Sequence, residues 1–378
     1  MDAAADLTAW LRLLLSPGVG RDLARRLLAA FGSAEAVFDA SPAALKPFTT
    51  AAQLASLRRV PDDLAERVAA TQDWLAAGTA RHCITVGDAD FPQILLQTED
   101  PPLLLFAQGR LEVLQHPALA VVGSRNPTPQ GIENARAFAD HLGASGWCIV
   151  SGLALGIDAA AHAGGLAHAG STIAVVGTGL DRVYPSRHRD LAHAIATHGL
   201  LLSEFAIGTP PLRENFPRRN RVIAGLSRGT LVVEAALKSG SLITARHALE
   251  AGREVFAIPG SIHSPLARGC HALIKQGARL VESAADILDE LGGSGAAAAP
   301  ALRPEQPAPV PADAQGGAEG GAHARLLGHM GHDPVTLDAL LARSGESAST
   351  LNAQLLELEL AGAVCRLAGG LFQRVARA

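Results

Sequence analysis

The chain has 378 residues, of which 48% are apolar and 18% charged, and its formal net charge is −4. This composition excludes a disordered chain, and the length predicts two or three domains. The four cysteines lie far apart without a CxxC pair, and no apolar run reaches transmembrane length, so we expect no disulfide framework, no zinc site and no membrane contact. We therefore expect a cytoplasmic protein.

Residues 7–77 show apolar positions at spacings of three and four, which predicts helices. The stretch SPGVG, Ser16 to Gly20, separates the first two, and Arg21 follows it. Such a turn can present backbone N–H groups to a phosphate and resembles a helix-hairpin-helix element. A plain turn between helices explains it equally well, and the pattern leaves both interpretations open.

Short apolar runs alternate with helical stretches from about residue 82 to 290. The runs are ALAVVGS, CIVSG, TIAVVGTG, LLLSEF, TLVVEA and EVFAIPG. Strands that are apolar throughout are covered on both faces, which predicts a Rossmann-like α/β core with a parallel sheet. Ligands of such sheets bind beyond the carboxyl ends of the strands, where the glycine turns lie here.

The C-terminal part begins with a segment rich in glycine, alanine and proline over residues 291–322, which we interpret as a flexible linker. Three helical stretches and a hairpin at Gly369–Gly370 follow, in the order of a winged helix. The expected recognition helix and its lead-in, 344–360, contain three glutamates and no basic residue. We interpret this domain as a protein-contact module or a structural remnant.

Common enzyme signatures are absent or incomplete. The Walker A pattern fails because Leu237 stands where a glycine is required, and GTGLDR departs from the dinucleotide fingerprint at Arg182. GLSRG matches GxSxG, but a helix is expected before it and a strand after it, which is the reverse of a nucleophile elbow. No HExxH or comparable pair occurs among the 14 histidines. We therefore expect a protein that has no catalytic activity and binds neither a cofactor nor a metal.

Several glycine turns after predicted strands carry hydrogen-bond donors, and small residues there let a ligand approach closely. The candidate binding residues in these turns are Gly123, Ser124, Arg125, Ser151, Gly152, Gly156 and Asp158. For Asp158, capping of the following helix is an equally good explanation.

The most basic segment is 181–228, which has eight arginines against four acidic residues, a formal charge of +4. Forked arginine donors suit phosphate oxygens, and Tyr184 and Phe216 offer faces for unpaired bases, which together indicate a groove for single-stranded nucleic acid. Alternatively, the arginines of this segment form only a solvated basic surface that binds no ligand. The candidate residues are Arg182, Phe216, Arg218, Arg219, Asn220 and Arg221, together with Lys238.

These motifs, taken in order, resemble the DNA-processing protein A (DprA/Smf) family. The blocks are GSR, SGLALGIDAAAH, GLDRVYP, SEF, FPRRNRVIAGLS, VVEAALKSGSLITA, AIPG and LIKQGA. The resemblance implies a sterile-alpha-motif-like domain, a Rossmann core and a winged-helix-like domain. It also implies single-stranded DNA binding, a homodimer formed through the core, and loading of a RecA-type recombinase in natural transformation. Arg125 and the arginines of FPRRNR would hold the DNA backbone. The chain departs from the family at His188 and His271, where asparagine is usual.

The sequence thus predicts a non-enzymatic mediator that binds single-stranded DNA. The expected domains are 1–80 (helical), 81–290 (Rossmann-like, DNA-binding), 291–322 (linker) and 323–378 (winged-helix-like). One alternative is a nucleotide-binding Rossmann hydrolase related to phosphoribohydrolases, with Glu234 as its carboxylate, although Glu234 is better suited to orienting turns or capping a helix. A sequence-specific regulator acting through the winged helix is disfavoured by the acidic helix.

Overall fold

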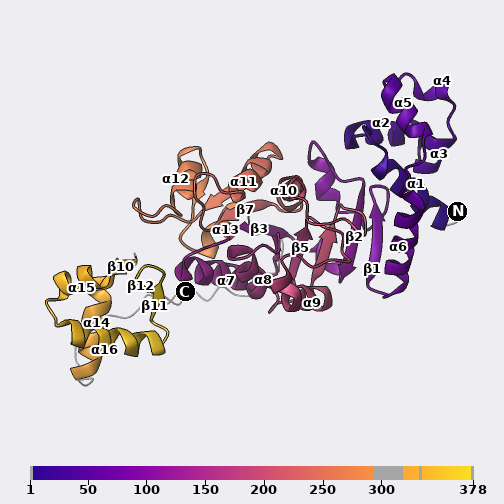
Figure 1. Ribbon diagram of the computed structural model, residues 1–378. Helices are drawn as coiled ribbons and strands as arrows, with labels where there is room; N and C mark the ends of the chain where they lie inside the picture. Colours follow the sequence, from indigo (N-terminus) through magenta and orange to yellow (C-terminus); the bar gives the residue numbers. More distant parts are fainter. Residues whose placement is uncertain (1–2, 293–317, 332–333, 376–378) are drawn as a thin grey trace.

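The computed structural model describes residues 3–292, 318–331 and 334–375 (Figure 1). The predicted linker over 291–322 lies for the most part outside these ranges. No helix in the described ranges has both the length and the apolar character needed to cross a membrane.

The chain begins with the expected helical region. Its helices are α1 (Ala3–Leu15), α2 (Arg21–Phe31), α3 (Ala34–Asp39), α4 (Pro42–Leu45), α5 (Ala51–Arg58) and α6 (Leu64–Ala76). Their apolar faces share one core with the adjoining edge of the sheet, where Trp74 packs edge-on against Phe106 at 6.3 Å between ring centroids. The SPGVG turn joins α1 to α2, and α5 binds its carbonyls: Ser56 donates to Pro17 O at 2.6 Å and Gln53 to Gly18 O at 3.3 Å.

The centre of the molecule is a nine-stranded sheet in the order β1-β2-β6-β5-β4-β3-β7-β8-β9. Strands β3 to β9 run parallel, whereas β1 and β2 add an antiparallel edge beside β6. The strands are β1 (Arg81–Thr85), β2 (Leu104–Gly109), β3 (Ala118–Val122), β4 (Cys148–Ser151), β5 (Thr172–Val176), β6 (Leu200–Ser203), β7 (Gly229–Val232), β8 (Glu254–Ala257) and β9 (Arg279–Leu280). All six predicted strands are confirmed, and the Rossmann-like core with them.

Helices cover both faces of the sheet, which is why its central strands are apolar throughout. Leu119 and Val121 of β3 pack with α7 (Pro129–Ala144), α8 (Ile157–Gly165) and α13 (Ala284–Glu290). Ala120 and Val122 face the opposite layer, α10 (Asn215–Gly225), α11 (Ser241–Glu250) and α12 (Arg268–Lys275). Helix α9 (Arg189–His198) packs near β2 and β6, and short 3-10 helices occupy Gln93–Gln97, Leu111–Gln115 and Ser186–His188.

The strand order reverses direction at β3. Strands β4, β5 and β6 extend the sheet on one side of β3, and β7, β8 and β9 extend it on the other. The connections that leave the carboxyl ends of β3 and β7 therefore separate to opposite faces and leave a crevice, which is where ligands bind in open α/β sheets.

The order around Ser227 is the one that the sequence indicated. Helix α10 ends at Gly225 and β7 begins at Gly229, so the GxSxG match lies between a helix and a strand. Ser227 is fully buried, and its hydroxyl donates to Ile223 O at 3.0 Å. This serine has neither the position nor the exposure of a nucleophile.

The C-terminal region forms a separate apolar cluster. Its elements are α14 (Ala318–Met330), β10 (Val335–Thr336), α15 (Leu337–Ser344), α16 (Ala348–Leu360), β11 (Val364–Leu367) and β12 (Leu371–Arg374). The hairpin between β11 and β12 turns at Gly369 and Gly370, both with positive φ, as the sequence predicts. The three helices and the hairpin have the order of a winged helix.

Candidate nucleic-acid interface

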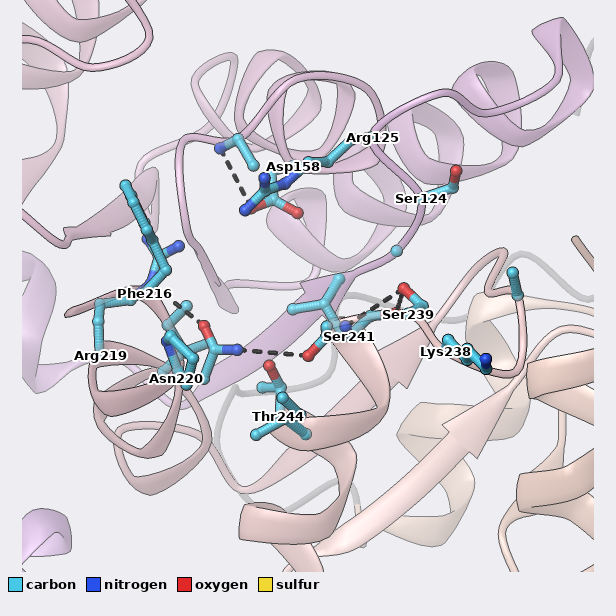
Figure 2. Close-up of a pocket in the computed structure, with 18 of the residues that line it drawn as sticks. Ser124, Arg125, Asp158, Phe216, Arg219, Asn220, Lys238, Ser239, Ser241 and Thr244 are labelled. Carbon is cyan, nitrogen blue, oxygen red and sulfur yellow. Dashed lines mark hydrogen bonds between the residues drawn. The ribbon is translucent and has the colours of Figure 1, made fainter. Parts of the chain in front are cut away.

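A cavity of about 750 Å³ opens at the crevice between β3 and β7 (Figure 2). Turns after β3, β4 and β7, together with the start of α10, form its walls. It brings together eight of the residues predicted from the sequence: Gly123, Ser124, Arg125, Asp158, Phe216, Arg219, Asn220 and Lys238.

Three exposed cations line this cavity: Arg125, Arg213 and Lys238. Within the described parts of the chain, none of them forms an ion pair with an acidic side chain. Many other arginines are engaged, as in the pairs Arg182–Asp181 and Arg221–Glu204. The cavity therefore presents uncompensated positive charge, which favours an anionic ligand.

An aromatic pair, Tyr184 and Phe216, lines the same cavity. The rings of Tyr184 and Phe216 are 5.5 Å apart between centroids, and the guanidinium of Arg125 lies 5.9 Å from the centre of the Phe216 ring. Tyr184 is 48% exposed, so one aromatic face is open to solvent. A flat, uncharged group such as a nucleobase can stack there while arginine contacts its phosphate.

Arg219 lies beneath the cavity, with only 5% of its surface exposed. Its Nη1 donates to Gly152 O at 2.5 Å and also to Val175 O. Burial lowers the pKa of Arg219 to about 10, while the charge of Asp158 opposes this shift, so the guanidinium stays protonated at neutral pH. With its donors directed at buried carbonyls, Arg219 is suited to holding β4, β5 and α10 together under the site.

Asp158 lines the cavity, and its carboxylate is hydrogen-bonded within the protein. One carboxylate oxygen accepts the N–H groups of Gly152 and Ala154, at 3.1 and 3.2 Å, which precede α8. It makes no cap to the first turn of its own helix. Burial raises the pKa of Asp158, and the nearby charge of Arg219 counteracts that rise. Asp158 thus fixes the turn after β4 and balances the buried arginine.

Two glycines of this turn are required by close packing. A Cβ on Gly152 would lie 2.6 Å from Nη1 of Arg219, and a Cβ on Gly156 would lie 2.4 Å from Ser124 O. Gly156 also has φ +80°, which other residues rarely adopt. Neither glycine lines the main cavity, although Gly152 borders a small adjoining one of about 60 Å³. Their contribution is to let the turns after β3 and β4 meet.

Leu153, between these glycines, has φ +58°, and both its backbone N–H and its carbonyl are hydrogen-bonded to histidines. Its N–H donates to Nε2 of buried His162 at 3.2 Å, and burial lowers the pKa of His162 to about 3, which keeps that ring neutral and able to accept. Its carbonyl accepts from Nδ1 of His188 at 3.0 Å. His188 therefore supports the turn beside the cavity, whereas His271 binds Gly260 O at 2.9 Å on another turn.

The remaining predicted residues lie outside the main cavity. Ser151 is buried, and its hydroxyl donates to Val121 O at 2.6 Å, tying β4 to β3. Arg182 pairs with Asp181 at 3.2 Å on an exposed turn. Arg218 and Arg221 line a neighbouring cavity of about 390 Å³. Arg218 is exposed there, but Arg221 is committed to Glu204 and Asp100.

Glu234, the carboxylate of the alternative hydrolase reading, does not line the main cavity. Its two oxygens accept from the hydroxyl of Thr128 at 2.6 Å and the N–H of Thr128 at 2.9 Å. Thr128 is the N-cap of α7, so the carboxylate holds the start of that helix. This is the orienting role that the sequence favoured for Glu234.

Four charged or hydroxyl-bearing cavity residues were not singled out from the sequence: Arg213, Ser239, Ser241 and Thr244. Arg213 belongs to the basic segment and could have been included by its charge. The hydroxyl residues occur in KSGSLIT, directly after a predicted strand and at the start of a helix, which is a pattern typical of phosphate-binding turns.

Comparison with known proteins gives matches over most of the chain. The family model described as DNA recombination-mediator protein A matches residues 82–292, and models of a DprA-like N-terminal HHH domain and a DprA winged helix domain match 4–67 and 303–370. Protein Smf of Escherichia coli is 44% identical over 306 residues, covering 79% of this chain and 78% of that protein.

Two solved structures are similar. The X-ray structure of DNA processing protein A (DprA) from Streptococcus pneumoniae gives a TM-score of 0.66 at 38% identity, over 75% of this chain and 97% of that one. A structure of DNA processing protein A from Helicobacter pylori, described as giving insights into its unique single-stranded DNA binding mode, gives a TM-score of 0.52 at 30% identity. The match covers 57% of this chain and 98% of that one. With its motifs, fold and sequence in agreement, the chain belongs to the DNA recombination-mediator protein A (DprA/Smf) family.

Proposed function

We propose that this protein binds single-stranded DNA in the cavity between β3 and β7 and acts without catalysis as a recombination mediator. The observation that carries the proposal is the combination, in one cavity, of three cations without acidic partners and an aromatic pair beside one of them. Cations take the phosphates and aromatic rings take the unstacked bases, a combination that suits single strands and shows little sequence preference.

The similarity to the Helicobacter pylori protein supports the choice of ligand, because that protein is described as binding single-stranded DNA. The family description supports the role of mediator. We extend it to the protection of incoming DNA and the loading of a RecA-type recombinase during natural transformation, with a cytoplasmic homodimer as the acting form. The described region has no carboxylate lining the cavity other than Asp158, which is engaged with two backbone amides.

The binding test is fluorescence anisotropy with labelled single- and double-stranded oligonucleotides of one sequence. We expect the single strand to bind more tightly, and Arg125→Ala and Lys238→Ala each to weaken it. Arg136→Ala is the matched control, since Arg136 is exposed on α7 and away from the cavity. Preference for the duplex, or equal losses in the control and the cavity variants, would contradict the proposal.

Mediation requires a separate assay. A RecA-type recombinase is added to single-stranded DNA already covered by a single-strand-binding protein, and its DNA-dependent ATP hydrolysis is followed. We expect the wild-type protein to shorten the lag before hydrolysis, and Arg125→Ala to shorten it less. If the lag is unchanged while DNA binding is intact, the protein binds single strands but does not load the recombinase.

A further inference from the structure

The start of α11 forms one wall of the cavity and is rich in hydroxyl groups. Figure 2 shows Ser239, Ser241 and Thr244 together on this wall, with Asn220 beside them. The hydroxyls of Ser239 and Ser241 are 2.6 Å apart and bonded to each other. Lys238 directly precedes them and is exposed. We define these four residues, Lys238, Ser239, Ser241 and Thr244, as the hydroxyl wall.

Thr244 is the residue that points to a ligand. It is 1% exposed yet lines the cavity, and within the described chain its hydroxyl makes no hydrogen bond. A helical threonine can bond the carbonyl three or four residues earlier, but Thr244 makes no such bond within the described chain. The free donor of Thr244 is therefore available to a group that enters the cavity.

The backbone at this helix start is already in use. The N–H groups of Ser241, Leu242 and Ile243 bond to the Ser239 hydroxyl, Ser239 O and Gly240 O, at 3.3, 3.2 and 3.1 Å. The helix end alone thus offers few open amides, and ligand binding here falls to the side chains.

Asn220 holds the hydroxyl wall in place. Its amide nitrogen donates to Gly240 O at 3.3 Å, and its oxygen accepts from Nε of the buried Arg219 at 3.2 Å. Each end of this side chain therefore makes one hydrogen bond within the protein. Asn220 joins α10 to the turn before α11 and also lines the cavity, where the sequence predicts a DNA contact.

We propose that the hydroxyl wall binds one phosphate group, with Lys238 supplying the charge and Thr244 donating a hydrogen bond together with whichever serine does not donate to the other. The proposal rests on the proposed function and deepens it by assigning a phosphate position opposite the aromatic pair. Hydroxyls and an ammonium group together offer several donors and a positive charge, which suits phosphate oxygens. The phosphate comes either from the backbone of the bound strand or from a free nucleotide.

The first test measures binding of labelled oligothymidine to full-length variants. Thr244→Val removes the hydroxyl at nearly constant volume, and we expect the affinity to fall about tenfold, as for loss of a hydrogen bond to a charged group. Thr244→Ser keeps the hydroxyl and should restore binding. The control is Thr230→Val in β7, because Thr230 is also fully buried with an unbonded hydroxyl but lies outside the cavity. It should bind as wild type does.

The second test identifies the source of the phosphate. The shortest oligothymidine that binds is prepared with one uncharged methylphosphonate linkage, moved through each position. A position whose neutralisation weakens wild-type binding but not Thr244→Val assigns the hydroxyl wall to the DNA backbone. If thymidine monophosphate instead displaces the strand from wild type and not from Thr244→Val, the group bound is a free nucleotide's phosphate.

The two proposals fail in different ways. If the wild-type protein does not bind single strands, the proposed function is wrong. If it binds them and Thr244→Val, folded by its circular dichroism, binds equally well, only the hydroxyl wall is overturned. If Thr244→Val does not fold, Ser239→Ala replaces it, because Ser239 is less buried. Wild-type affinity of the folded Ser239→Ala variant would then overturn the hydroxyl wall.

Discussion

Arg21 on α2 and Asp100, in the loop that leads into β2, form an ion pair at 2.5 Å that joins the N-terminal helices to the sheet. Arg25 contacts the same carboxylate at 2.8 Å, and Arg221 on α10 lies 3.4 Å from it. Arg221 also binds the nearly buried Glu204. Helix α10 therefore contributes to the cavity between β3 and β7 through one side and to this ion-pair network through another.

The network predicts a pH dependence of stability. Partial burial alone would raise the pKa of Asp100, but hydrogen bonds from Arg21 and Arg25 and the charge of Arg221 outweigh it and lower the pKa to about 2. A depressed carboxyl pKa stabilises the fold above the unfolded value of about 4, and this contribution disappears as the pH falls towards 2.

We expect Asp100→Asn to lower the free energy of unfolding by about 1 kcal/mol at pH 7, a discounted value because Asp100 is one-third exposed. The difference from wild type should shrink as the pH is lowered from 5 to 3, measured by urea unfolding. A difference that stays constant over that range would show that the network does not hold Asp100 ionised.

Neighbouring arginines should differ sharply in their effect on stability. Arg219→Ala removes a buried guanidinium and leaves Asp158 buried without its compensating charge, which should cost about 3 to 5 kcal/mol. Arg218→Ala removes an exposed side chain and should change stability by less than about 0.5 kcal/mol. Urea unfolding followed by circular dichroism measures both, and equal effects would refute the assignment of Arg219 to the cavity floor.

If nucleobases stack on the aromatic pair, removing one of its rings should lower the affinity for single strands by the same factor at every salt concentration. Phe216→Leu should cost about 1 to 3 kcal/mol of single-strand binding free energy while leaving the salt dependence unchanged, because no phosphate contact is lost. Tyr184→Phe keeps the ring and should bind normally. Anisotropy titrations at several salt concentrations give both quantities, and a Phe216→Leu variant with wild-type affinity would exclude stacking.

Glu234 should matter for stability and not for binding. Glu234→Gln weakens the hydrogen bonds to Thr128 at the start of α7, and we expect a loss of about 1 kcal/mol. Single-strand affinity should stay at the wild-type level, because Glu234 lies outside the cavity. If Glu234→Gln has normal stability but binds single strands much more weakly, Glu234 contributes to binding and this prediction is wrong.

The strands that were predicted are those buried on both faces, such as β3 and β5, whose residues are all buried. Strand β1 was missed because it is a half-exposed edge strand that begins with Arg81 and His82. Strand β2 was missed although it is buried, because it follows closely after two prolines and pairs antiparallel at the edge of an otherwise parallel sheet.

The site was predicted in outline and less well in detail. The arginines of FPRRNR are neighbours in sequence, but successive residues of a helix point about 100° apart. Arg218 therefore faces solvent, Arg219 the floor of the cavity and Arg221 the carboxylate of Glu204. Which side of α10 meets which partner depends on tertiary packing, and local charge patterns do not contain that information.

The most direct test of the account is the salt dependence of single-strand binding by wild type and an Arg125→Ala/Lys238→Ala double variant. If both cations contact phosphates, the slope of log K against log salt concentration should fall in magnitude by about 1.4, at roughly 0.7 per contact. An unchanged slope, with the double variant folded, would mean that these cations are only a solvated face and that the cavity between β3 and β7 does not hold the DNA backbone.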